Sequence, residues 1–175
     1  KTNTYGFIWS FIELGFFNFK AMGDVSRTEG RYQNRIRRKK KQIQGGSYFD
    51  ILESHWISVK GEIEHSFKKL TEEFDVSKSP EIPFKFHEDM NQILKQIKQA
   101  YTVLKDDKSR REYRLKLIEK DKIVQSAELL SKKGEMAILR RDRREGVMCF
   151  SKALELVPGR QDFLDGLRRS TSIGS

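Results

Sequence analysis

Two stripes of apolar residues at helical spacing, separated by a short polar loop, constrain the fold of this 175-residue chain most strongly. The first stripe consists of Ile63, Phe67, Leu70 and Phe74. The second stripe consists of Met90, Ile93, Leu94, Ile97, Tyr101 and Leu104. Each pattern is typical of one face of an amphipathic helix. Two such helices bury both stripes most simply as an antiparallel hairpin, which predicts an all-α fold.

Shorter helices are expected on both sides of this hairpin. One precedes it and is built around Tyr48, Ile51 and Leu52. Ser58 is the expected N-cap of the helix that carries the first stripe, because its hydroxyl can accept a backbone N–H. Asp106 or Asp107 can cap a further helix that begins near Lys108.

Three motifs run through this part of the chain between Tyr48 and Tyr113. They are Tyr48-Phe49-Asp50-Ile51-Leu52, Ala100-Tyr101-Thr102-Val103-Leu104 and Arg110-Arg111-Glu112-Tyr113. Their order resembles the DnaJ-type co-chaperone domain, or J-domain. That family stimulates ATP hydrolysis by a DnaK-type chaperone through a His-Pro-Asp loop after its second helix. The matching positions here are Asp75, Val76 and Ser77, so the resemblance implies a degenerate J-like domain without the catalytic tripeptide.

The basic face of the second helix, which the family uses to attract its chaperone, is diluted in this chain. Its candidate partner-contact residues are Lys60, Lys68 and Lys69. Acidic residues interleave with them, namely Glu62, Glu64, Glu72 and Glu73. We therefore expect no stimulation of a chaperone ATPase. An atypical co-chaperone with an unusual loop is the alternative.

Small residues and a proline recur at helical spacing in residues 121–169, at Ala127, Gly134, Gly146, Ala153 and Pro158. This spacing resembles a single tetratricopeptide-like helical hairpin, in which small residues let two helices approach closely. Leu130 and Ala137 stand where that family has large aromatic residues. Because one repeat cannot bury its own face, this hairpin must pack against the J-like domain, the N-terminal helix or residues outside this chain.

The segments that flank these two units have distinct compositions. Residues 1–22 are rich in Phe and Trp, which predicts an aromatic amphipathic helix that docks onto the chain or ends a preceding domain. Residues 23–46 predict a basic flexible linker or an exposed helix. Its candidate phosphate contacts are Arg35, Arg37, Arg38, Lys39, Lys40 and Lys41. Residues 47–120 form the predicted J-like domain, and residues 170–175 a disordered tail.

The composition narrows the classes of function. The net charge of +10 indicates an acidic partner, without choosing between nucleic acid, an anionic membrane and an acidic protein face. The single cysteine, Cys149, excludes an internal disulfide and favours a reducing compartment. The sequence has no phosphate-binding glycine loop, no Gly-x-Ser-x-Gly turn and no His/Asp/Glu cluster, so we expect neither an enzyme nor a cofactor.

These patterns favour a protein–protein interaction or scaffold module within a larger cytoplasmic, bacterial protein. The first apolar run is too short to cross a bilayer, so no membrane partner is expected. A DnaK-type chaperone and nucleic acid are the alternative partners. Nucleic acid would meet the basic tract through its phosphates, which position a protein without reading sequence.

Overall fold

The computed structural model describes residues 19–78 and 82–173, with the backbone only for residues 19–28. Every regular element in those ranges is a helix, so the predicted all-α class is confirmed. The α-helices are α2 (Phe19–Gly45), α3 (Tyr48–Ile51), α4 (Lys60–Phe74), α5 (His87–Leu104), α6 (Asp107–Leu117), α7 (Lys120–Leu139), α8 (Arg143–Leu156) and α9 (Gln161–Thr171). Two 3₁₀ turns, η1 (Val76–Lys78) and η2 (Phe84–Phe86), lie between α4 and α5. The aromatic helix predicted for residues 1–22 falls almost entirely outside the described residues.

Helices α4 and α5 form the predicted hairpin and pack their apolar stripes together. The ring of Phe67 on α4 stacks on that of Tyr101 on α5, with centroids 3.8 Å apart. Asp106 caps α6 as predicted, since its carboxylate accepts the Ser109 backbone N–H at 2.8 Å. Ser58 was the wrong N-cap: α4 begins one residue later, and Val59 N–H donates to the Glu62 carboxylate at 3.2 Å.

The flexible-linker alternative for residues 23–46 is wrong, because those residues belong to α2 up to Gly45. The helix packs against both α3 and α5. Ile36 on α2 is 5% exposed and lies in the same core as the α4–α5 stripes, with Tyr32 and Ile43 packed beside it. The spacing of these three residues places them on one side of the helix, and that apolar side fixes α2 to the hairpin.

The second core lies within α7, α8 and α9, and the ring of Phe150 is at its centre. Two glycines bring the outer helices against this fully buried ring. A Cβ atom on Gly134 of α7 would lie 2.6 Å from a ring carbon, and one on Gly166 of α9 would lie 2.2 Å from another. These glycines therefore allow three helices to approach closer than any side chain would permit.

The prediction of a disordered tail at residues 170–175 is wrong at its start. Helix α9 continues to Thr171, and Ser170 is fully buried. Its hydroxyl donates to the Gly166 carbonyl at 2.9 Å and packs where a side chain on Gly146 would otherwise project. Satisfying that hydroxyl within the helix allows a polar residue to occupy the α8–α9 contact.

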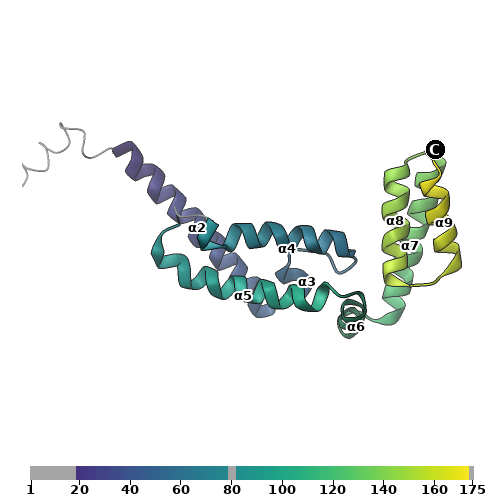
Figure 1. Cartoon of the computed structure of the whole chain (residues 1–175), viewed down its shortest axis with the longest axis horizontal. Coiled ribbons are helices and arrows are strands. Elements are labelled where there is room, and N and C mark those ends of the chain that lie inside the picture. Colours follow the sequence, from purple (N-terminus) through teal and green to yellow (C-terminus); the bar gives the residue numbers. More distant parts are fainter. Residues whose placement is uncertain (1–18, 79–81, 174–175) are drawn as a thin grey trace, which may run out of the picture.

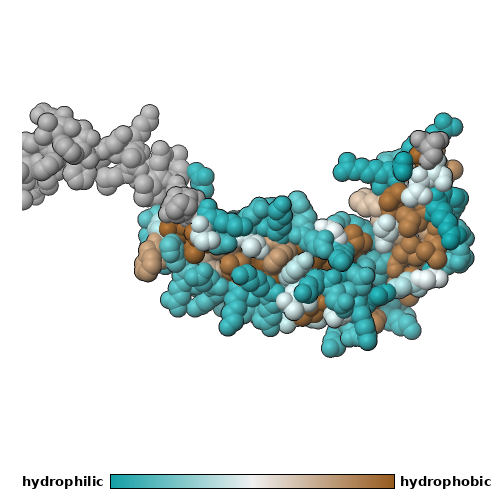
Figure 2. Space-filling view, viewed as in Figure 1, coloured by the Kyte–Doolittle hydropathy of each residue, from teal (hydrophilic) through white to brown (hydrophobic). Residues whose placement is uncertain are grey.

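We refer to α2–α6 as the N-terminal unit and to α7–α9 as the C-terminal unit. Figure 1 shows the C-terminal unit standing at one end of the elongated N-terminal unit, with α6 at the corner. In Figure 2, hydrophobic surface follows the seam of the N-terminal unit and gathers again over the C-terminal unit. Trp56, from the α3–α4 loop, packs against both cores and so spans the corner.

The contact between Phe150 and Gly166 can be tested with Gly166→Ala. The added methyl group has no space against a buried ring, so the free energy of unfolding should fall by about 1–3 kcal/mol. Gly61→Ala is the matched control, because a Cβ there meets nothing within 4 Å on α4. That control should be neutral or stabilise the protein by about 0.5–1 kcal/mol. Urea unfolding measures both, and an equal effect of the two substitutions would contradict the assigned packing.

Candidate functional site

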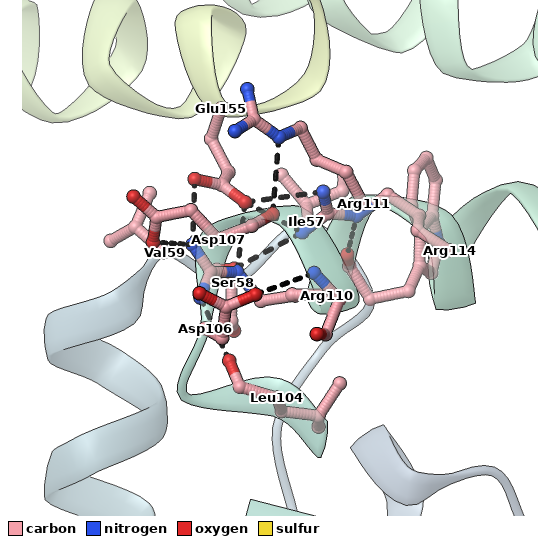
Figure 3. A network of polar contacts seen from close by, with 12 residues as sticks. Ile57, Ser58, Val59, Leu104, Asp106, Asp107, Arg110, Arg111, Arg114 and Glu155 are labelled. Atoms are coloured by element: carbon pink, nitrogen blue, oxygen red, sulfur yellow. Dashed lines mark hydrogen bonds and ion pairs between the residues drawn. The ribbon is translucent and has the colours of Figure 1, made fainter. Parts of the chain in front are cut away.

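The two units are joined by a polar network that centres on buried arginines of α6 (Figure 3). Arg110 is fully buried, and its Nε and Nη2 atoms donate to the two carboxylate oxygens of Glu155 on α8 at 2.8 and 2.9 Å. Its remaining donors bind the Leu104 carbonyl at 2.7 Å and the Asp107 carboxylate at 2.8 Å. The guanidinium therefore binds the carboxylates of Glu155 and Asp107 and also satisfies a backbone carbonyl at the C-terminal end of α5.

Arg114, one turn further along α6, connects the same carboxylate to the N-terminal core. It is 1% exposed, and its Nη1 lies 3.2 Å from the Glu155 Oε1 atom. Its Nε donates to the Trp56 carbonyl at 2.8 Å, and the guanidinium lies over the Phe49 ring at 5.6 Å. Burial lowers the pKa of Arg114, although Glu155 opposes the shift. Taken together, these contacts attach α3, the α3–α4 loop and α8 to one side chain.

The degenerate tripeptide positions lie at the end of α4, where Asp75 is the C-cap. The Asp75 carboxylate accepts the Ser77 hydroxyl at 2.6 Å and the Ser77 backbone N–H at 3.1 Å. These hydrogen bonds from Ser77 lower the pKa of Asp75, so the tip carries a fixed negative charge. Val76 and Ser77 continue into the turn η1. The negative charge of Asp75 is opposite in sign to that of a protonated histidine.

The candidate contact residues of α4 are exposed. Lys60 lies 4.0 Å from Glu64, one turn along, at the limit of an ion pair. Lys68 and Lys69 are exposed and form no ion pair with the described residues. Among the acidic residues of α4, Glu62 does form an ion pair. Its carboxylate lies 2.7 Å from the Lys152 ammonium of α8, which adds a second polar link between the units.

The basic tract of α2 divides into an internal and an external set. Lys39 is fully buried, and its ammonium donates to Glu53 at 2.8 Å. Arg35 pairs with the same carboxylate at 2.7 Å and with Glu73 of α4, while Lys40 pairs with Asp89 of α5 at 2.6 Å. The three remaining residues, Arg37, Arg38 and Lys41, are exposed. About half of the predicted phosphate-contact tract is therefore engaged within the fold.

The internal set creates a strongly coupled charge cluster under α2. Burial lowers the pKa of Lys39 even though Glu53 stabilises its charge. For Glu53, burial acts to raise the pKa, but the hydrogen bonds from Lys39 and Arg35 outweigh it and the pKa falls. The Glu53 carboxylate thus takes the place of the water that the Lys39 ammonium loses on burial, and a buried charge needs such a partner.

A groove runs between α2 and α5 beside this cluster. Its volume is about 550 Å³ at one end, where its walls are formed by Lys40, Ile43, Gln44, Gln92, Ile93, Lys95 and Gln96. It adjoins a second hollow, which shares Lys40 and Gln44 with it and is also lined by Gln33, Ile36, Arg37, Lys41 and Asp89. The two adjoining hollows are together called the groove. The exposed basic residues Arg37 and Lys41 therefore belong to a concave surface that a neighbouring helix completes.

A smaller apolar pocket of about 230 Å³ lies at the corner between the units. Leu115 of α6 and Ile123 of α7 contribute to its lining, together with Pro158 after α8. Arg114 also borders it, so the pocket adjoins the polar network. Elsewhere on the C-terminal unit, Leu129, Met136 and Leu139 of α7 are between 55% and 76% exposed.

Residues 19–78 and 82–173 contain no group of three or more His, Cys, Asp or Glu side chains that could hold a metal ion. Cys149 is buried, and that burial raises the pKa of its thiol. None of the helices in the described ranges is both long and apolar enough to cross a membrane.

Comparison with known proteins gives no match to a family model, a curated protein or a solved structure. The resemblances to a J-domain and to a tetratricopeptide unit therefore stay predictions.

Sequence reasoning missed the network of Arg110, Arg114 and Glu155. A signal was present in residues 107–117, which lack an apolar stripe at helical spacing. The only buried residues of α6 are Arg110 and Arg114, one turn apart. The apolar residues of this short helix, Tyr113, Leu115 and Leu117, form no continuous buried stripe, so buried polar groups with partners help to fix it in the fold.

The network predicts a large loss of stability in Glu155→Gln. Both arginines remain buried but lose the compensating charge, so the free energy of unfolding should fall by about 3 kcal/mol. Asp107→Asn removes the exposed partner of Arg110 and should cost at most about 1 kcal/mol. Urea unfolding followed by circular dichroism compares the two variants. A smaller effect at Glu155 than at Asp107 would show that the network does not hold the units together.

The Lys39–Glu53 cluster predicts an acid-dependent loss of stability. Because the pKa of Glu53 is lower in the folded state, its contribution is complete above the unfolded pKa of about 4.3 and disappears as the pH falls through the folded value. The stability difference between wild type and Glu53→Gln should therefore be largest near neutral pH and shrink in acid. Thermal unfolding across this pH range measures it. Glu72→Gln, at an exposed site on α4, should follow wild type throughout.

Proposed function

We propose that this chain is a protein–protein interaction module that acts as a scaffold, built from a degenerate J-like unit and a tetratricopeptide-like unit. The observation that carries the proposal is the contact of Arg110 and Arg114 with Glu155. Two helical units joined by buried, hydrogen-bonded charges keep a constant orientation, so surfaces on both units stay at a fixed spacing. A scaffold needs this property, whereas two units on a flexible linker lack it.

The proposal assigns the chain no catalytic step and no cofactor. It is supported by the internal contacts of the carboxylates at the candidate site. Glu155 and Glu53 each bind two basic side chains, and the Asp75 carboxylate is held by Ser77. Carboxylates paired in this way stabilise the fold. The proposal retains a cytoplasmic location in bacteria, which the single buried cysteine suits.

The alternative, an atypical co-chaperone, is disfavoured by the chemistry of the α4 tip. An acidic group hydrogen-bonded to Ser77 occupies the position where the family has histidine. The exposed bases Lys68 and Lys69 of α4 are interleaved with glutamates, so the surface next to the tip has little net charge. Attraction of an acidic ATPase surface to this helix would be correspondingly weak.

The scaffold proposal is tested by capture of partners with the whole chain after nuclease treatment. Proteins retained on wild type are identified and then purified, so that direct binding can be measured. Exposed substitutions map the contact, with Lys68→Glu and Lys69→Glu together on the N-terminal unit and Leu129→Ser and Met136→Ser together on the C-terminal unit. We expect at least one purified partner whose affinity falls by about tenfold, or 1.4 kcal/mol, in one of these variants.

Turnover of ATP by a DnaK-type chaperone provides the opposing measurement. The scaffold proposal expects equal rates with and without the chain. A several-fold stimulation that disappears in Asp75→Asn would establish the co-chaperone alternative instead. Failure to recover any directly binding protein after nuclease treatment would also overturn the scaffold proposal.

A further inference from the structure

The groove between α2 and α5 combines three features that are separate in the sequence. Basic side chains, glutamine side chains and isoleucine side chains all contribute to its lining. Its α2 side includes Arg37 and Lys41, which form no ion pair with the described residues, as well as Lys40, which pairs with Asp89. Its α5 wall comes from the outward side of the helix that carries the second apolar stripe.

The charge of the groove is strongly one-sided. Arg37 and Lys41 on α2 and Lys95 on α5 are exposed and form no ion pair with any described residue. Lys40 is held to Asp89 across the groove at 2.6 Å, so that pair adds no net charge. Arg37 and Lys41 line one of the two adjoining hollows and Lys95 lines the other, so three unpaired cations border the groove and their field attracts an anionic ligand.

The polar and apolar parts of the groove suit a polypeptide. Gln44 on one wall and Gln92 and Gln96 on the other can each donate and accept hydrogen bonds, as the backbone of a peptide requires. Ile36 and Ile93 are almost fully buried, and the half-buried Ile43 lies between the walls. Of these three isoleucines, Ile43 is the one with enough exposed surface to contact a nonpolar side chain of the ligand.

We propose that this groove binds an acidic segment of a partner protein, with its carboxylates paired to Arg37, Lys41 and Lys95. The inference rests on the proposed scaffold function and names the chemistry of one partner. The glutamines bind the peptide backbone, and Ile43 contacts an apolar side chain between the acidic residues. The preformed walls limit the ordering that binding requires, because α2 and α5 are already packed together.

Nucleic acid is the competing ligand for a basic surface, and the groove suits it less well. The Asp89 carboxylate lies within the groove, and Glu88 accepts a hydrogen bond from Gln92 at 3.3 Å beside it. Both carboxylates would repel a phosphate backbone and an acidic peptide alike, so they do not distinguish the two ligands. Among the described residues that line the groove there is no aromatic side chain on which a base could stack.

Fluorescence anisotropy tests the proposal with the whole chain and a labelled peptide of alternating glutamate and leucine. Arg37→Glu combined with Lys41→Glu should weaken binding by at least about tenfold, because both contacts become repulsive. The matched control, Lys122→Glu combined with Lys132→Glu, makes the same change of net charge on exposed residues of α7. It should weaken binding by less than about twofold, as expected for a distant screened charge.

A second variant separates the groove from simple charge attraction. Gln92→Ala combined with Gln96→Ala leaves the net charge unchanged and should still weaken binding by about threefold, through lost hydrogen bonds. Thermal unfolding of every variant checks that the fold is intact. All four substituted positions on the rim and α5 wall are exposed or half-buried, so none removes a core contact.

The outcomes divide clearly. Equal losses in the two charge-reversed pairs, or an unchanged affinity in the glutamine variant, would overturn the groove as the binding site. Tighter binding of a single-stranded oligonucleotide, lost in the α2 variant and steeply dependent on salt, would assign the surface to nucleic acid. Absence of peptide binding beside successful capture of a protein partner would overturn only this inference, and the scaffold function would stand.

Discussion

The shared carboxylate of Glu155 is the interaction on which the arrangement of the molecule depends. It accepts hydrogen bonds from Arg110 and Arg114, and those arginines also bind carbonyl oxygens of Leu104 and Trp56. A guanidinium can satisfy several acceptors in one plane, which makes it suited to a buried junction. Without the carboxylate the same two arginines would be buried cations in mutual repulsion, so the corner between the units requires the pair and its acceptor together.

The basic character of the chain has two separate physical roles. Part of the charge on α2 is internal, where Lys39 and Arg35 converge on Glu53 and hold the helix onto the hairpin. The rest is external, where Arg37 and Lys41 border a groove that α5 completes. The net charge of the sequence counts both sets equally. It therefore overstates the charge that a ligand meets on this surface.

Much of the fold could be predicted from local patterns. The apolar spacing of residues 63–74 and 90–104 predicted α4 and α5, and Asp106 predicted the start of α6. The candidate site was less accessible to such reasoning. The run of basic residues at 35–41 looked uniform, but helical geometry turns Lys39 inward and Arg37 outward, and only the position of Glu53 determines which of them is neutralised. The resemblances to a J-domain and a tetratricopeptide unit remain predictions that no comparison tests.

The sequence by itself determined that the chain is helical, where its main amphipathic helices lie and that its charge is basic. Helical periodicity and capping involve residues a few positions apart, so they can be predicted from the sequence. Only the tertiary structure decided that Arg110 and Arg114 meet Glu155, that Phe150 lies between Gly134 and Gly166, and that α2 and α5 share a groove. Those contacts join distant residues, and they exist because burial in a common core brings the helices together and leaves each buried charge dependent on a partner from another element.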